Sequence, residues 1–172
     1  MHSHLFNPIN DTSQLLKTIE YIHVECHRLC KKNLGYLLPV AGNIGVFCHF
    51  EDEFIRLTRI REELTEANNN WNKKYFKLHV PIIIPQKNEI PATTYTYLYI
   101  RKPNKNTPHI GDVDFYMEPN KFLALKQSLL EDKTMEGVSI FNRPDLDLIR
   151  LFDPEINVSS FIGQKTMIEN IL

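Results

Sequence analysis

Two stretches of alternating residues decide the fold: Thr94-Tyr95-Thr96-Tyr97-Leu98-Tyr99-Ile100-Arg101 and Gly111-Asp112-Val113-Asp114-Phe115-Tyr116. In the first stretch the tyrosines and the arginine fall on alternate positions, and in the second two carboxylates and a tyrosine do the same. Strand side chains alternate between faces, so each polar set shares one face of a strand. A face of Tyr, Arg and Asp suits the lining of a polar pocket. It suits a solvated sheet surface equally well.

The segments around these strands predict helices and further strands. Residues 11–33 are expected to form an amphipathic helix, because apolar residues recur at helical spacing after three capable N-cap residues. Further helices are predicted from residue 51 and over 121–130. Strands are predicted over 37–50, 75–84, 94–101, 109–117, 138–141, 146–152 and 156–162. Pro81 lacks a backbone N–H, so it predicts that 75–84 is an edge strand or a bulged one.

The order of these elements repeats weakly along the chain. Asn43-Ile44-Gly45 and His109-Ile110-Gly111 each open a strand that is followed by a helix and two strands. We therefore predict an α+β fold with a mostly antiparallel or mixed sheet, helices on one face and two βαββ-like halves. A ferredoxin-like sandwich is the alternative. The expected single domain covers residues 11–163, with a tail at 1–10 and a tail or short helix at 164–172.

Two local motifs resemble a known family. Pro108-His109-Ile110 and Phe152-Asp153-Pro154-Glu155 are similar to signatures of the vicinal oxygen chelate (glyoxalase-like) superfamily, which pairs two βαβββ modules around a cupped sheet. The resemblance covers about residues 42–162. Metal-binding members need a second ligand on a module's last strand, where residues 157–161 offer only serine, and Asn43 stands where a histidine is expected. The resemblance therefore implies an incomplete metal site, and we assign no metal ligands and leave the cofactor open.

Composition narrows the class of protein. The 172 residues carry 20 Lys and Arg against 21 Asp and Glu, which argues against a dedicated nucleic-acid binder. Three cysteines are too few for a disulfide framework, so we expect a reducing, cytoplasmic setting. The sequence shows no secretory signal and no apolar run of membrane-spanning length, so a membrane partner is not expected.

One cluster of potential metal ligands stands out: His23, Cys26, His27 and Cys30. Thiolates and imidazoles on adjacent turns of a helix are zinc ligands in other settings. The two cysteines, however, lie in the apolar stripe of the predicted helix, where a free cysteine behaves as a small hydrophobe. One straight helix also cannot easily surround a metal with four ligands. The packing interpretation is the stronger one.

The candidate site residues come from the strands and the turns beside them. Asp112 and Asp114 suit acid–base work, and His109 lies at a loop-to-strand junction near them, so these three are the catalytic candidates. The ligand-binding candidates are Tyr97, Tyr99, Arg101, Arg143, Asp145 and Asp147. For the last three, which surround Pro144, an ordinary turn is the alternative. For the tyrosines, the alternative is cross-strand aromatic packing.

We therefore expect a small-molecule-binding domain with a cleft on the Tyr, Arg and Asp face, in which Arg101 anchors an anionic group. Whether it is an enzyme is left open. The alternative is a non-catalytic interaction or oligomerisation module. That module would use the tyrosine face or the apolar residues within 167–172 to contact a partner or a second copy.

Overall fold

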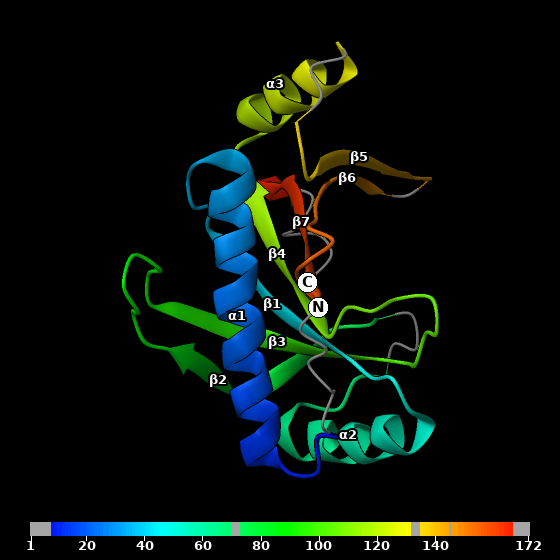
Figure 1. Ribbon diagram of the computed structural model, residues 1–172. Coiled ribbons are helices and arrows are strands. Elements are labelled where there is room, and N and C mark those ends of the chain that lie inside the picture. The colour runs from blue at the N-terminus through cyan, green and yellow to red at the C-terminus, as the bar shows by residue number, and fades with distance from the viewer. Residues whose placement is uncertain (1–7, 70–72, 132–134, 145, 167–172) are drawn as a thin grey trace.

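The structure is a computed structural model that describes residues 8–69, 73–131, 135–144 and 146–166 (Figure 1). The expected apolar tail at 167–172 lies outside these residues. The elements in chain order are α1 (Thr12–Leu34), β1 (Val40–Phe47), α2 (Glu51–Leu64), β2 (Phe76–Ile84), β3 (Thr93–Arg101), β4 (Gly111–Met117), α3 (Pro119–Leu130), β5 (Val138–Arg143), β6 (Leu146–Leu151) and β7 (Val158–Gln164).

The first helix forms because both of its ends are capped and one stripe is apolar. The Asp11 carboxylate accepts a hydrogen bond from the Gln14 backbone N–H at 2.8 Å. Gly35 ends the helix with φ of 83°, a left-handed conformation that glycine adopts without steric cost. Leu15, Ile19 and Leu29 are fully buried along the stripe. The predicted helix is confirmed.

The described strands form one seven-stranded mixed sheet in the order β2-β3-β1-β4-β7-β6-β5. β1 runs parallel to β3, and β4 runs parallel to β7, so the first and last strands of each half are neighbours. The halves join through the antiparallel pair β1–β4. The α+β fold with two similar halves is confirmed. The first half is βαββ and the second is βαβββ, an order that differs from the βαββαβ of a ferredoxin-like sandwich.

A register shift in the outer strands changes the tyrosine pattern. β2 lies at the edge of the sheet, and its pairing with β3 shifts between Lys77 and Ile82, beside Pro81. The edge or bulged strand predicted from that proline is confirmed. The shift also interrupts the alternation in β3. Tyr95 is fully buried against His23 of α1, whereas Tyr97 and Tyr99 are half-buried, so Tyr95 does not extend the tyrosine row.

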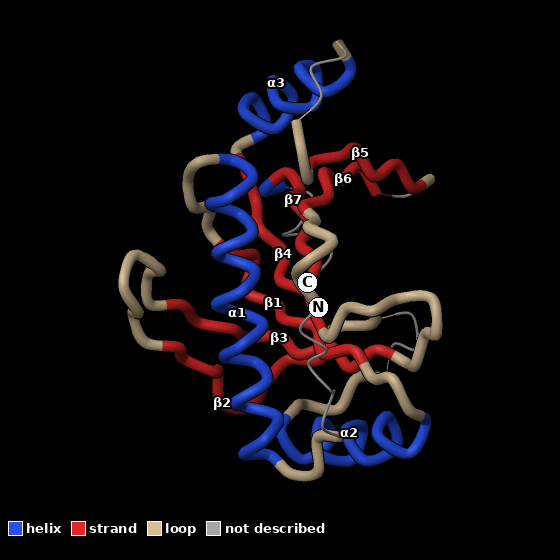
Figure 2. Tube along the Cα trace, viewed as in Figure 1, coloured by secondary structure: helices blue, strands red, loops and turns tan. Residues whose placement is uncertain are grey.

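The three helices bury their apolar residues in one core with the sheet. α1 crosses the strands near the middle of the sheet, α2 lies near β2 and β3, and α3 lies near β5 (Figures 1 and 2). Val113 and Phe115 of β4 share this core with Leu57 of α2 and Phe122 of α3. The other face of β4 carries Asp112 and Asp114, since side chains alternate along the strand. The helices thus leave a polar sheet face uncovered by this core.

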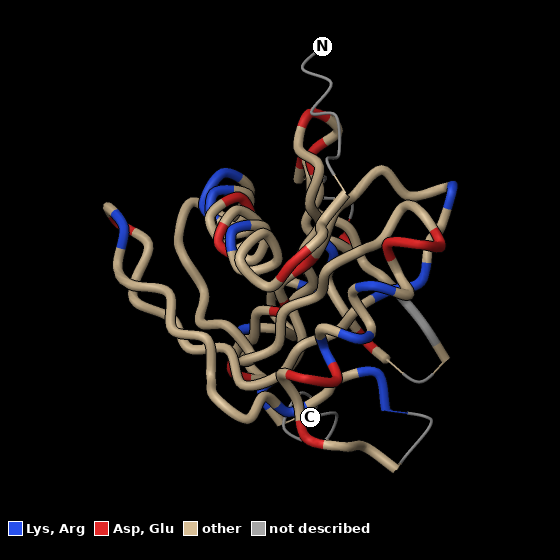
Figure 3. The backbone as a smooth tube through the Cα atoms, turned by 90° about the horizontal axis from the view of Figure 1, so that it is seen from below, with Lys and Arg blue, Asp and Glu red and all other residues tan. Residues whose placement is uncertain are grey.

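Charged residues of both signs are interspersed along the backbone (Figure 3). None of the helices among the described residues is long and apolar enough to cross a membrane.

The buried His23 makes stability depend on pH. Burial, and then the neighbouring His27, lower the pKa of His23 to about 4, whereas the unfolded residue titrates near 6.5. Between these values the unfolded chain binds a proton that the folded chain does not, so stability falls as pH drops through this window. We expect the wild type to lose about 1–2 kcal/mol more between pH 7 and pH 5 than His23→Asn loses. Urea unfolding at the two pH values measures both losses, and equal losses would contradict the expectation.

Candidate functional site

The register of the central strands brings most of the predicted site residues onto one surface. In the parallel pair β1–β3, Asn43, Gly45 and Phe47 lie beside Tyr97, Tyr99 and Arg101. On the other side of β1, Gly45 pairs with Asp112 of β4. We call this surface the polar face and define it by Asn43, Tyr97, Tyr99, Arg101, Asp112 and Asp114. It lies opposite the face that packs on α1.

Asp112 and Asp114 are partly buried carboxylates on the same side of β4. Asp114 accepts hydrogen bonds from Asn43 Nδ2 at 2.7 Å and from the Tyr75 hydroxyl at 3.2 Å. Burial raises the pKa of Asp114, while these two bonds oppose the rise. Burial, and then the charge of Asp114, raise the pKa of Asp112 well above its usual range. Two such carboxylates side by side favour holding one proton between them.

Gly45 makes the position of Asp112 possible. A Cβ added at Gly45 would overlap the Oδ1 atom of Asp112, and it would also lie 3.2 Å from the Phe47 ring. The carboxylate therefore occupies the space that a side chain on β1 would need. On the other side of Asp112, the pairing strand β7 carries Ser159, which is also small. Asp112 therefore has a small residue on each neighbouring strand, Gly45 on β1 and Ser159 on β7.

Arg101 lies at one end of the polar face with its guanidinium over an aromatic ring. Its Cζ atom is 3.4 Å from the centre of the Phe47 ring, a cation–π geometry. Its buried Nε has no hydrogen-bond partner in the part of the chain that the structure describes. Burial lowers the pKa of Arg101, while the charge of Asp112 raises it. Among the described residues, the Arg101 Nε–H therefore remains a donor without an acceptor.

His109 lies just before β4 and close to two arginines. Burial, then the charge of Arg150 and then that of Arg101, lower the pKa of His109 to about 4. The imidazole is therefore neutral at pH 7, with one nitrogen able to accept a hydrogen bond or a proton. This histidine lies in the segment before β4, within reach of the charge of Arg101.

The remaining predicted residues lie elsewhere. Asp147 accepts a 2.6 Å hydrogen bond from Lys126 of α3, and it alternates with Arg150 along β6, so it does not face the polar face. Arg143 ends β5, and its side chain lies outside what the structure describes, as does all of Asp145. The strand register thus places Asp112 and Asp114 on the same face as Tyr97, Tyr99 and Arg101, and His109 precedes that face in the chain.

The His and Cys cluster of α1 packs into the core. His23 Nδ1 lies 2.8 Å from the Tyr95 hydroxyl, and His27 Nδ1 donates to the His23 carbonyl at 2.8 Å. The Cys26 thiol donates to the Ser159 carbonyl at 3.6 Å, and burial raises the pKa of that thiol. Among the described residues, no group of three or more His, Cys, Asp or Glu is arranged to hold a metal ion.

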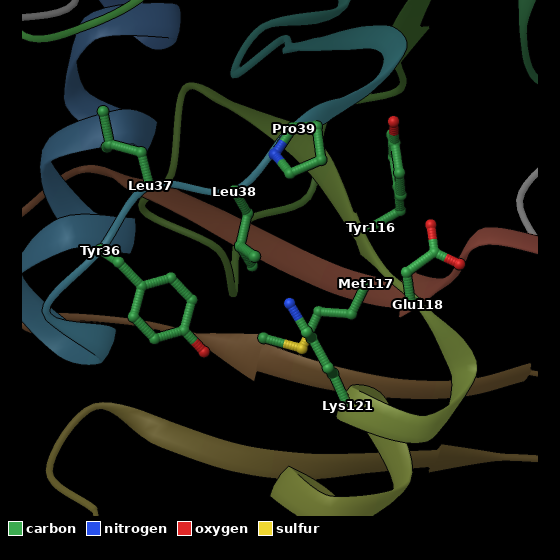
Figure 4. A pocket seen from close by; sticks show the side chains of 8 residues that line it. All are labelled: Tyr36, Leu37, Leu38, Pro39, Tyr116, Met117, Glu118 and Lys121. Atoms are coloured by element: carbon green, nitrogen blue, oxygen red, sulfur yellow. The ribbon is translucent and has the colours of Figure 1, made fainter.

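A cavity of about 460 Å³ opens at the far end of β4. It lies between the segment that precedes β1 and the start of α3, and its lining residues are Tyr36, Leu37, Leu38, Pro39, Tyr116, Met117, Glu118 and Lys121. The Lys121 amino group and the Met117 side chain point into the same space, whereas Tyr116 extends away from Met117 (Figure 4). The sequence did not predict this cavity, because its lining residues come from three segments without a shared motif.

Three residues of the polar region were not predicted as site residues: Asn43, Tyr75 and Arg150. The weak repeat aligned Asn43 with His109, but Asn43 lies inside β1, whereas His109 precedes β4. Tyr75 precedes β2, and its ring packs edge-on against Tyr99 with centroids 5.8 Å apart. No local sequence pattern singles out Arg150.

Comparison with known proteins yields only distant likenesses. No family model matches the chain, and no curated protein matches it. A variant of Streptomyces coelicolor methylmalonyl-CoA epimerase in complex with 2-nitronate-propionyl-CoA matches with a TM-score of 0.33 and 17% identity, covering 74% of this chain and 97% of that one. A methylmalonyl-CoA epimerase in complex with methylmalonyl-CoA and NH4+ gives 0.32 and 17%, covering 74% and 94%.

An integron cassette protein from the mobile metagenome of Halifax Harbour Sewage Outfall gives a TM-score of 0.23 and 14% identity, covering 71% of this chain and 95% of that one. TM-scores this low carry no conclusion about what this chain binds.

The Asp112 carboxylate costs stability at neutral pH. The pKa of Asp112 is higher in the folded protein than in the unfolded chain, so protonation of Asp112 favours folding. The stability that Asp112 contributes below its unfolded pKa of about 3.8 is lost as the pH rises through its folded pKa. We expect Asp112→Asn to raise the free energy of unfolding at pH 7 by about 1 kcal/mol. The gain should vanish near pH 3.5, where the unfolded carboxyl is mostly protonated. Urea unfolding at both pH values measures it.

Asp52→Asn is the matched control for that experiment. Asp52 is 78% exposed in the first turn of α2, where its charge favours the helix, so its replacement should give no gain. A gain for Asp52→Asn equal to that for Asp112→Asn would contradict the account.

The overlap at Gly45 predicts a coupling between two substitutions. We expect Gly45→Ala to destabilise the protein by about 1–3 kcal/mol, because the new methyl group displaces the Asp112 carboxylate. In an Asp112→Ala background the same change should cost clearly less, because the overlapping oxygen is gone. Unfolding of the four proteins in a double-mutant cycle measures the coupling. An identical cost of Gly45→Ala in both backgrounds would refute it.

Proposed function

We propose that this chain binds a small molecule on the polar face, with Asp112 and Asp114 exchanging a proton with it and Arg101 contacting an anionic group. One observation carries the proposal. Two carboxylates lie together, partly buried, near an arginine whose Nε has no hydrogen-bond partner among the described residues. Charged groups removed from water without full pairing cost free energy. A surface that served only the fold would pair them or replace them.

The chemistry of the set supports proton transfer. With raised pKa values, the Asp112–Asp114 pair keeps a proton to higher pH than free carboxyl groups do, so it can donate to one ligand atom and accept from another. Asn43 and Tyr75 fix Asp114 by two hydrogen bonds, which leaves Asp112 as the less restrained member. His109 would supply a neutral imidazole within reach of the Arg101 charge. Perturbed groups gathered in this way are typical of functional sites.

A second candidate function is an interaction module. It is supported by the edge strand β2, where Val80 is 77% exposed and Ile83 is 71% exposed. Exposed apolar residues on an outer strand are typical of association surfaces. A dimer that Val80→Lys separates, seen in native mass spectrometry, would favour this function over the first.

Binding on the polar face predicts that Arg101 contributes to ligand affinity but little to stability. Native mass spectrometry of protein purified without a metal-affinity tag, followed by a thermal-shift screen of small carboxylic and phosphoric acids, identifies a ligand. We expect Arg101→Ala to abolish its binding, because the anionic group loses its charged donor, while the melting temperature changes little.

Arg61→Ala serves as the control for this prediction. Arg61 also stacks on a phenylalanine, Phe76, with its Cζ 3.7 Å from the ring centre, but it belongs to α2. Its replacement should leave binding intact. A large stability loss for Arg101→Ala without a change in affinity would overturn the proposed role.

A further inference from the structure

The cavity at the end of β4 lies between two segments that the protein's own contacts hold in place. Its first wall is formed by residues 36–39, which connect α1 to β1. The Cys30 thiol donates a hydrogen bond to the Tyr36 carbonyl at 3.5 Å, and the Tyr116 backbone N–H donates to the Pro39 carbonyl at 3.1 Å. Both ends of this short segment are therefore fixed without a ligand, as in most small-molecule sites.

The second wall is the beginning of α3, which a buried ring anchors. Phe122 is fully buried, and its backbone N–H donates to the Glu118 carbonyl at 3.0 Å. Lys121 precedes Phe122 in the chain, so its side chain starts from a fixed turn of the helix. Its amino group reaches into the space that the cavity encloses (Figure 4). The cavity is thus bounded by an ordered turn on this side as well.

The floor of the cavity is apolar. Leu38 and Met117 line it and are only 9% and 4% exposed, respectively. Figure 4 shows both side chains pointing into the cavity, with the Tyr36 ring beside them. The volume of about 460 Å³ lies within the range of small-molecule sites. An apolar group placed on this floor would leave water and thereby gain free energy.

The charges around the cavity leave one cation without a counter-ion. Glu118 already has a partner, because the Lys165 Nζ lies 3.6 Å from its Oε1 atom and 5.9 Å from the centre of the Tyr116 ring. Lys121 has no carboxylate within 4.0 Å in the part of the chain that the structure describes. Once Glu118 is neutralised, the cavity lining retains one positive charge, which favours an anion.

We propose that this cavity binds a small organic acid, with its apolar chain on the floor of Leu38 and Met117 and its carboxylate beside the Lys121 ammonium. An apolar floor with one cation above it matches a molecule that has an apolar body and one anionic end. The lining includes no residue of the polar face. The cavity is therefore a second site, and the inference does not rest on the proposed function.

Three probes titrated into the full chain separate the two requirements: hexanoate, acetate and hexylamine. NMR of protein with 13C-labelled methionine methyl groups follows Met117, and Met135, which does not line the cavity, is the internal reference. We expect hexanoate to shift the Met117 signal until it saturates. Acetate should bind about tenfold more weakly, because it lacks the chain that gains from burial. Hexylamine should also bind more weakly than hexanoate, because Lys121 repels its charge.

Variants isolate the part played by Lys121. Because this side chain is exposed to water, Lys121→Met, which keeps the stem and removes the charge, should weaken hexanoate binding only about threefold. Lys121→Glu reverses the charge and should weaken it about tenfold. Lys17→Met is the matched control, because Lys17 is an exposed lysine of α1 that does not line the cavity, and it should change nothing.

Several outcomes would overturn the inference. Equal shifts of Met117 and Met135 would indicate non-specific association, and the absence of a saturable Met117 shift would leave no binding in the cavity. Unchanged hexanoate affinity in both Lys121 variants, or equal binding of hexylamine, would remove the preference for an acid. Loss of the Met117 shift in Arg101→Ala would assign hexanoate to the polar face instead. The proposed function fails separately, if Arg101→Ala leaves the affinity of the ligand found in the thermal-shift screen unchanged.

Discussion

The pairing of β1 with β4 depends on two positions that tolerate no side chain. On the polar face, Gly45 leaves the space that Asp112 fills. On the helix face, a Cβ at Gly111 would overlap both the Gly45 carbonyl and the end of Ile22 from α1. The two halves of the sheet therefore meet only because the backbone is bare on both sides of one strand pair. Everything that the halves build together, the α1 packing and the polar face alike, relies on that close approach.

This junction also explains why charged groups gather where they do. A strand at the centre of a sheet is shielded on both edges by its neighbours, so polar residues on β4 lose water even on the face without helices. Asp112 and Asp114 respond by favouring their protonated forms, and Asn43 and Tyr75 supply two compensating hydrogen bonds. Arg101 stacks on Phe47 but is left without a partner for Nε in the described structure. These incompletely paired charged groups all lie on the polar face.

Alternation and capping predicted much of this fold. Asp11 and Gly35 fixed the ends of α1, Pro81 placed β2 at an edge, and the Asn43 and His109 repeat anticipated two similar halves. The polar residues of β3 and of β4 could each be assigned to one face of their strand, because side chains alternate between the two faces with a period of two residues. Tyr95 does not follow this alternation, because its ring contacts His23 of α1. The register shift beside it depends on the partner strand β2, which the local sequence of β3 does not encode. Arg150 could not be predicted, because its position depends on the order in which β4, β7 and β6 pair.

The place of α1 in the chain has a consequence for synthesis. This helix is made before every strand that the structure describes, yet its buried stripe packs against β1, β4, β6 and β7, and β7 is the last strand of the described chain. Each half can pair its own first and last strands as soon as that half is complete, because those contacts close shorter loops. The stripe of Leu15, Ile19 and Leu29 must wait for both halves. Until the final strand has left the ribosome, the leading helix therefore presents an apolar surface that is open to chaperones or to mispairing.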